Sequence, residues 1–200
     1  THSLDVWTDL LGDDDFTNDT LSNIINNVSV STFPYVETFD SQIDGNNLAS
    51  YDMPTFDNGW QNDQADDFDW QPHGDQPSSG TGTGPNADHT GGGMYMYVEA
   101  STPNSPAKTA NFDYPCMDFT NLQYPAFSYW YHMHGINMGT LYVLVDTGGS
   151  AWDTVEVWTG AQQASHTEAW RNSILDLSAY GGHSSVAIRF SGVTGPGFES

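Results

Sequence analysis

Carboxylates and aromatic rings are concentrated in one stretch of the chain, residues 63–98. Its centre reads Asp66-Asp67-Phe68-Asp69-Trp70, and after a passage rich in Gly, Ser and Pro it continues as Asp88-His89-Thr90. Ca²⁺ is a hard cation that takes roughly six to eight oxygen ligands, so clustered carboxylates with loop carbonyls suit it. The side chains of Asp67 and Asp69 project to the same side if this segment is extended.

The sequence therefore predicts a structural Ca²⁺ site in this stretch. Its predicted ligands are Asp67, Asp69 and Asp88, with Glu37 and Asp40 contributing from the first strand of the domain. The alternative is that the acids of residues 66–69 only cap turns and accept backbone N–H bonds. Both alternatives make the acidic stretch a structural element that fixes the shape of the domain.

Two histidines, His132 and His134, alternate onto one face of a predicted strand. A zinc site needs about three or four ligands of defined geometry, and the sequence places no third His or Cys nearby. Cys116 lies in no motif that marks a nucleophile, and no Gly-x-Ser-x-Gly is present. Acid pairs are too abundant here to indicate a glycosidase. The sequence predicts a protein that is not an enzyme.

A binding surface is predicted where outward-facing side chains of neighbouring strands come into register. Flat aromatic faces stack on the C–H groups of sugars, which makes such a strip a candidate glycan site. The alternative is that the long loop 57–93 folds over this sheet and buries the aromatic rings as a second, smaller core. The predicted strip consists of Trp130, His132, Tyr142, Trp158 and Arg189.

The charge of the chain limits its partners. Three basic residues face 26 acidic ones among 200, a formal net charge of −23. Nucleic acids are excluded because phosphate neutralisation needs clustered Lys and Arg. No run of about 18 apolar residues is present, so direct membrane insertion is not expected.

The second half of the chain is a succession of alternating strands separated by Gly-rich turns. Predicted strands cover residues 127–133, 141–146, 154–158, 174–178 and 186–190. With no convincing long helix, this pattern predicts an all-β, antiparallel sandwich carrying a long structured loop. Residues 1–30 contain two extended runs and an acidic turn, which is too little for a domain. They are interpreted as the C-terminal hairpin of an upstream immunoglobulin-like domain, and residues 31–200 as the main domain.

The main domain carries a series of short motifs, in the order Phe39-Asp40, Trp60, Asp66–Trp70, Thr83-Gly84-Pro85, Asp88-His89-Thr90, Tyr95–Ala100, Phe127–Met133, Met138–Leu141, Trp170, Leu175–Leu177 and Arg189–Gly192. This is the order found in MAM domains, the extracellular modules of meprins, neuropilins and receptor tyrosine phosphatases, with many bacterial relatives. Over residues 33–200 the chain closely resembles this family.

The resemblance implies a jelly-roll β-sandwich that is non-catalytic, extracellular, and used in contacts with surface proteins or glycans. Some members of the family bind Ca²⁺ near the acidic loop. The family usually closes with a further strand, so the domain is expected to lack its last one here. We expect an adhesion or structural module of a large multidomain bacterial cell-surface or secreted protein, with other domains of the same chain as partners. The alternative is a carbohydrate-binding module attached to a secreted hydrolase or protease.

Overall fold

The computed structural model describes residues 2–7, 20–25, 29–45, 51–52, 56, 59–74, 83–149 and 151–198. Its described elements are β-strands and one short 3₁₀ helix. They are β1 His2–Trp7, β2 Thr20–Ile25, β3 Gln61–Asn62, β4 Gln71–His73, β5 Tyr95–Tyr97, β6 Thr109–Met117, β7 Ala126–Tyr131, β8 Thr140–Asp146, β9 Asp153–Thr159, β10 Arg171–Asp176, η1 Ser178–Tyr180 and β11 Val186–Val193. None of these described elements is a helix that could cross a lipid bilayer.

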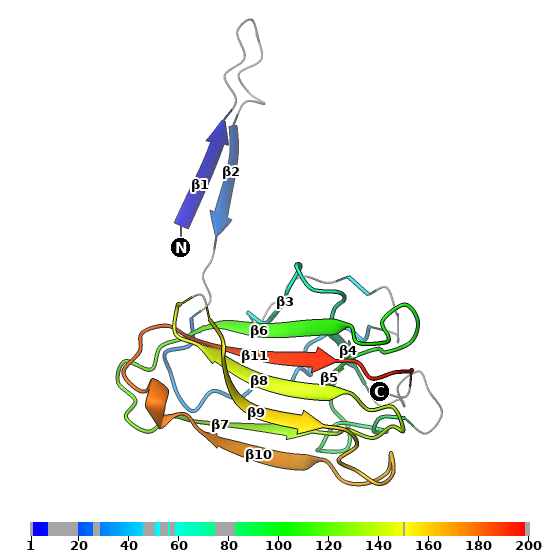
Figure 1. The fold of residues 1–200 in the computed structure, drawn as a ribbon. Helices are drawn as coiled ribbons and strands as arrows, with labels where there is room; N and C mark the ends of the chain where they lie inside the picture. The colour runs from blue at the N-terminus through cyan, green and yellow to red at the C-terminus, as the bar shows by residue number, and fades with distance from the viewer. Residues whose placement is uncertain are drawn as a thin grey trace, which may run out of the picture.

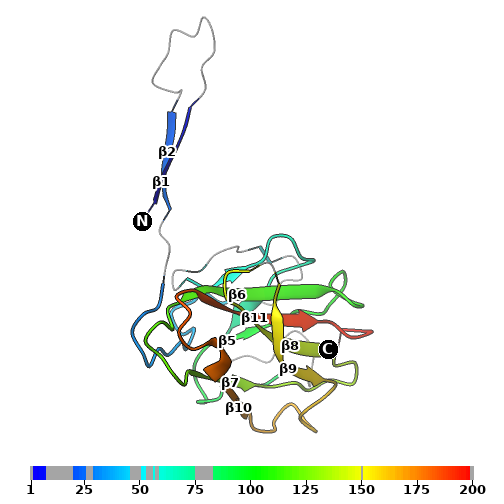
Figure 2. The ribbon, with the colours of Figure 1, turned by 60° about the vertical axis from the view of Figure 1, so that its left-hand side comes forward.

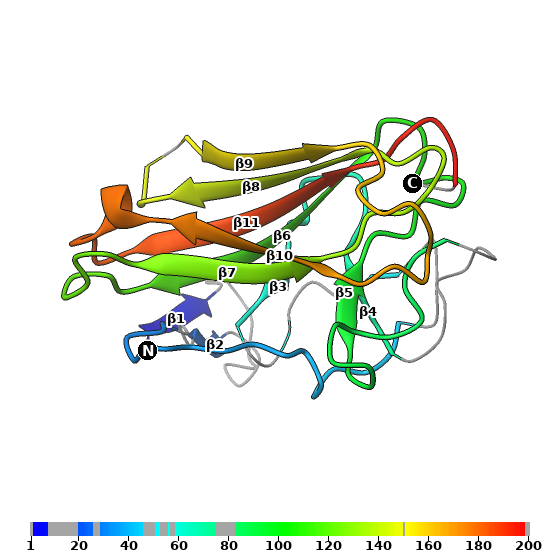
Figure 3. The ribbon, with the colours of Figure 1, turned by 90° about the horizontal axis from the view of Figure 1, so that it is seen from below.

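The strands form a two-layered antiparallel sandwich of the jelly-roll type, so the predicted fold class is confirmed. One layer is a five-stranded sheet in the order β3-β6-β11-β8-β9, and the β10-β7 pair faces it, while β4 and β5 form a separate two-stranded sheet. Viewed from below, β7 and β10 cross in front of the five-stranded sheet (Figure 3). The β1-β2 hairpin stands apart from the sandwich in both side views (Figures 1 and 2).

Alternation of side chains along the strands builds the core between the layers. In β8 the residues Leu141, Val143 and Val145 are buried, while their neighbours are only partly covered. Facing them, β7 supplies Tyr129 and Tyr131, both less than 9% exposed. Such two-residue periodicity is what a half-buried strand requires.

Strand β6, which lies between β3 and β11 inside the five-stranded sheet, was not predicted from the sequence. Its residues Phe112 and Tyr114 are each 1% exposed, but Pro115 interrupts the pattern. The pairing of β6 with β11 shifts register at this point, between Val186 and Ile188. A bulge tolerates a residue that cannot donate a ladder hydrogen bond, so the proline is compatible with a central strand.

Aromatic side chains from the loops complete the hydrophobic core beside strand β6. Trp60 is 5% exposed and stacks on Phe112 at 4.7 Å. The indole nitrogen of Trp70 donates to the Ala110 carbonyl at 2.8 Å. A Cβ on Gly192 would lie 3.2 Å from the Trp70 ring, so a glycine allows this close approach. The acidic stretch is thereby fixed against β6 and β11.

Candidate functional site

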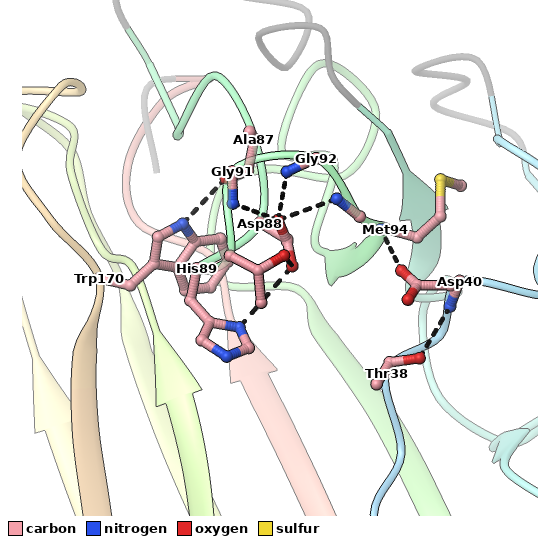
Figure 4. A network of polar contacts seen from close by, with 11 residues as sticks. Thr38, Asp40, Ala87, Asp88, His89, Gly91, Gly92, Met94 and Trp170 are labelled. Atoms are coloured by element: carbon pink, nitrogen blue, oxygen red, sulfur yellow. Dashed lines mark hydrogen bonds and ion pairs between the residues drawn. The ribbon is translucent and has the colours of Figure 1, made fainter.

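Asp88 organises a tight turn at one end of the sandwich. Its Oδ1 accepts the backbone N–H groups of Gly91, Gly92 and Gly93 at 2.8, 2.9 and 2.9 Å, and its Oδ2 accepts the Thr90 hydroxyl (Figure 4). Desolvation opposes ionisation of Asp88, but these hydrogen bonds outweigh it and hold the pKa of the carboxyl well below its usual range. Asp88 is therefore a carboxylate at every physiological pH.

Asp40 reaches the same turn from 48 positions earlier in the chain. Its Oδ1 accepts the Met94 N–H at 2.9 Å (Figure 4). A Cβ on Gly93 would collide with Asp40 Oδ1 and would lie 2.9 Å from Asp88 Oδ2. The two carboxylates thus approach the same face of Gly93, and both are among the predicted Ca²⁺ ligands.

Asp40 is held in place by its neighbour Phe39. The Phe39 ring packs against Trp60 at 5.7 Å and Phe112 at 5.8 Å, and its backbone adopts a φ of 60°. Positive φ is uncommon for a residue with a side chain, so core packing imposes the turn that follows. In the Phe39-Asp40 motif, the Phe39 ring therefore anchors the segment in the core and positions the Asp40 carboxylate, which accepts the hydrogen bond from the loop.

The other three predicted ligands lie elsewhere. Asp67 forms an ion pair with Lys108 at 2.8 Å and accepts the Thr109 N–H, whereas Asp69 is 7% exposed. The Asp67 side chain is 37% exposed, so the two acids differ in burial, and residues 64–67 form a turn and a bend instead of an extended segment. Glu37 accepts the Phe39 N–H and the Tyr35 hydroxyl. Within the described residues, no group of three or more His, Cys, Asp or Glu side chains is arranged to hold a metal ion.

Asp66 is the acid of this stretch whose ionisation the fold disfavours. Desolvation raises its pKa to about 7, although the Asn111 N–H donates to its Oδ2 at 2.5 Å. The nearby carboxylates of Asp63 and Asp69 act in the same direction as the desolvation. Asp66 fixes the acidic stretch to β6 through the backbone of Asn111.

The five residues of the predicted binding strip do not share one face. Tyr142 and Arg189 lie on the outer side of the five-stranded sheet, where Arg189 pairs with Asp113 at 2.6 Å and lies 4.4 Å above the Trp152 ring. Trp130 and His132 belong to the segment of β7, in the opposite layer. The predicted register across these strands is wrong because the strands belong to different sheets.

Trp158 points inward, against the prediction. It stacks on Tyr131 at 4.8 Å, and its indole donates to the Tyr129 hydroxyl at 2.9 Å. The pairing of β8 with β9 shifts register between Val143 and Leu144, and Trp158 then pairs with the buried Leu141. Val157, next to it, is 46% exposed, since the ring takes the interior position.

The loop around Asp88 contacts β7 and the segments beside it. His89 stacks on Trp130 with ring centroids 4.7 Å apart, and the Trp170 indole donates to the Ala87 carbonyl at 2.9 Å (Figure 4). His132 packs edge-on against Trp170 at 5.7 Å. Desolvation lowers the pKa of His132 to about 4, although an interaction with the Glu168 backbone acts in the opposite direction.

Two hollows border this loop. A groove of about 1000 Å³ between the layers is lined by residues 33–40 on one side and β7 on the other, with the aromatic core as its floor. A smaller pocket of about 370 Å³ lies between residues 85–91, residues 166–170 and Trp130. We call the second one the Trp130 pocket.

Sequence reasoning missed two residues that fix the site. Gly93 looks like one member of a flexible Gly-Gly-Gly run, and only its approach to Asp40 and Asp88 shows that it is required. Glu156 looks like a solvated acid on an alternating strand, yet it accepts hydrogen bonds from Tyr129 and Ser173 in the opposite layer. No signal in the sequence identifies either role.

Comparison with known proteins agrees with the motif order. The family model for the MAM domain, meprin/A5/mu, matches residues 54–200. MAM domain-containing glycosylphosphatidylinositol anchor protein 2 of Homo sapiens is 30% identical over 154 residues, which cover 68% of this chain and 15% of that protein. MAM domain-containing glycosylphosphatidylinositol anchor protein 1 of Gallus gallus is 29% identical over 146 residues, which cover 70% of this chain and 15% of that protein. The chain thus spans about 15% of the length of these curated relatives.

Two solved structures of cleaved adhesin domains of Lys-gingipain are also similar. The K1 domain, from Porphyromonas gingivalis W83, has a TM-score of 0.47 at 15% identity and covers 79% of this chain and 94% of that one. The K2 domain has a TM-score of 0.46 at 13% identity and covers 80% of this chain and 95% of that one. With the family model matching residues 54–200 and the motifs in the expected order, the chain belongs to the MAM domain family.

Proposed function

We propose that this MAM domain is a non-catalytic adhesion module, exposed outside the cell as part of a larger chain of β-domains. The observation that carries this is the loop end of the sandwich, where Asp88 and Asp40 tie residues 88–94 and the segment before Asp40 together through hydrogen bonds to the backbone. A rigid loop surface on a β-scaffold suits protein contacts because little conformational entropy is lost on binding. The curated relatives are named as glycosylphosphatidylinositol anchor proteins, which supports a location at the cell surface.

An adhesion assay tests this function directly. Beads coated with the protein are expected to attach to a cell surface or to an immobilised extracellular protein, whereas beads coated with the unfolded chain do not. A panel of cell types and matrix proteins that retains neither kind of bead would contradict the adhesion proposal.

We further propose that Ca²⁺ stabilises the loop end through Asp40 and Asp88. Both carboxylates offer oxygens to the same face of Gly93, and oxygen is the donor that Ca²⁺ prefers. Two carboxylates are fewer ligands than such an ion takes, so backbone carbonyls and water would complete its shell. When bound, the ion would offset the repulsion between the two negative charges.

The calcium proposal is tested by thermal unfolding with and without EDTA. Calcium is expected to raise the Tm of the wild-type protein and to have a much smaller effect on Asp40→Asn, which keeps the hydrogen bond to Met94. Asp146→Asn is the matched control, since Asp146 accepts the Gly149 N–H in a turn elsewhere. A Tm that EDTA leaves unchanged removes the calcium proposal.

The carbohydrate-binding alternative has less support from the geometry. It requires an open aromatic face, yet Trp158 is inside the core and His89 covers Trp130 in part. Trp130, 47% exposed, is the aromatic member of the predicted strip that keeps a large exposed surface. A polysaccharide pull-down that compares the wild type with Trp130→Ala tests this alternative. If the polysaccharide retains the wild-type protein but not the variant, the carbohydrate-binding alternative is favoured.

The large groove is proposed to be part of the core instead of a ligand site. Within the described residues, β7 pairs with β10 alone, so its other edge faces the groove across from residues 33–40. An open strand edge above an aromatic floor suits one further β-strand of the protein's own polypeptide. Hydrogen exchange checks this by comparing residues 1–200 with a longer polypeptide. In the longer polypeptide the β7 N–H groups that face the groove are expected to exchange more slowly. Equal exchange rates in the two proteins would contradict the proposal.

A further inference from the structure

The Trp130 pocket has the size and lining of a site for one side chain. Its volume of about 370 Å³ falls near the lower end of ligand pockets, roughly 300–1000 Å³. The half-exposed ring of Trp130 and the partly buried Trp170 both line it. Hydrogen bonding of the Trp170 indole to Ala87 fixes the loop that forms one wall, so the pocket is preformed.

The charges of the pocket favour a cation. Asp88 and Glu168 line it, and no Lys or Arg does. The Glu168 side chain is 39% exposed, so part of it is open to solvent although one oxygen approaches Arg171 at 3.4 Å, whereas the Asp88 side chain is 9% exposed and acts through its charge. Aromatic faces attract ammonium and guanidinium groups electrostatically. Carboxylates beside aromatic rings therefore form a receptor for an organic cation.

The rest of the surface acts in the same direction. All three basic residues of the chain are held in ion pairs, Lys108 with Asp67, Arg171 with Glu168, and Arg189 with Asp113 and Asp63. The whole chain carries a formal net charge of −23. Such a field steers basic partners toward the protein and repels acidic ones.

We propose that the Trp130 pocket binds the cationic end of a Lys or Arg side chain presented by a basic partner protein. This inference rests on the proposed adhesion function and names the chemistry of its partner. The pocket selects one residue, and the acidic surface around it accelerates the encounter. A neutral sugar would gain nothing from the field, and an anionic one would be repelled.

Titration with two short blocked peptides, Ac-Gly-Lys-Gly-amide and its norleucine counterpart, tests the proposal at about 150 mM salt. The indole N–H signals in the NMR spectrum report occupation of the pocket. The lysine peptide is expected to shift the Trp130 and Trp170 signals, and the norleucine peptide is not. Trp130→Ala is expected to weaken lysine-peptide binding by about 3- to 30-fold, the range that a cation–π contact implies. Tyr124→Ala, which removes a ring that is 76% exposed elsewhere, is the matched control.

Glu168→Gln separates charge from shape, because the amide oxygen can still accept the Ala164 N–H. This variant is expected to bind the lysine peptide more weakly and to fold normally. Equal binding of the peptide by wild type and Trp130→Ala would show that only the overall negative field acts, which overturns the proposal. Binding of norleucine peptide or of a neutral disaccharide at the same indole signals would overturn it as well. The peptide titration does not depend on the bead-adhesion assay. Failure of the cation-binding proposal can therefore be distinguished from failure of the adhesion proposal.

Discussion

Tyr129 on β7 and Glu156 on β9 belong to opposite layers of the sandwich, and their side chains meet in the core. The Tyr129 hydroxyl donates to Glu156 Oε2 at 2.5 Å and accepts the Trp158 indole N–H at 2.9 Å. Ser173 on β10 donates to the same carboxylate at 2.8 Å. Burial raises the pKa of the Tyr129 phenol far above its usual value, so it remains a donor throughout the physiological range.

Tyr129→Phe is therefore expected to destabilise the protein by about 1–3 kcal/mol, because it leaves the Trp158 indole without an acceptor and removes one donor from Glu156. Urea unfolding followed by tryptophan fluorescence measures the change. Tyr124→Phe, at an exposed ring, is the control and should not alter the midpoint. Equal midpoints for the two variants would show that this hydrogen bond contributes nothing to the joining of the layers.

Gly93→Ala is expected to destabilise the loop end of the sandwich by about 1–3 kcal/mol, a typical cost of overpacking. The added methyl group would collide with Asp40 Oδ1 and press on Asp88 Oδ2. Gly92→Ala provides the control, since a Cβ there meets nothing within 4 Å and the N–H to Asp88 is retained. Thermal unfolding compares the two, and an equal Tm would mean that Asp40 and Asp88 do not need a glycine between them.

Much of the sandwich was predictable because its strands bury alternate residues. The apolar members of β8, Leu141, Val143 and Val145, alternate without interruption, and the predicted strand matches the observed one closely. Strand β6 escaped prediction because Pro115 breaks the same pattern, and only the bulge that Pro115 and Cys116 form opposite Ala187 explains how the strand continues. A bulge in one strand depends on its partner, which a single sequence does not identify.

The candidate site was predictable only in part for a related reason. Asp40 and Asp88 were both named as ligands, but so were Asp67 and Asp69, since residue type alone cannot tell a carboxylate that meets another from one that meets Lys108. Trp158 was placed outside because the register shift near Val143 reverses the face of β9. In each case the position of the side chain depends on a contact with a residue far away in the sequence.

His132→Phe is expected to lessen the loss of stability in mild acid. Burial lowers the pKa of His132 to about 4 in the folded protein, whereas an unfolded histidine titrates near 6.5. The unfolded chain therefore binds a proton first as the pH falls from about 6.5 to 4, and the native state loses stability over that window. The nearby His134, His166 and Glu168 are present in both proteins, so the difference in Tm between wild type and variant isolates His132. A difference that stays constant from pH 7 to 4 would contradict this assignment.

Asp66→Asn and Asp67→Asn are neighbouring changes with opposite expected signs. Desolvation raises the pKa of Asp66 to about 7, so its contribution to stability is fully present below pH 3.8 and is lost as the pH rises through 7. Asp66→Asn, which keeps an acceptor for the Asn111 N–H, should thus become more stable than wild type between pH 4 and 7. Hydrogen bonds from Lys108 and Thr109 lower the pKa of Asp67, so Asp67→Asn should lose a little stability above pH 4, as expected for an exposed pair. Tm values measured from pH 3.5 to 8 check both, and parallel curves for the two variants would mean that the burial of Asp66 does not disfavour its charge.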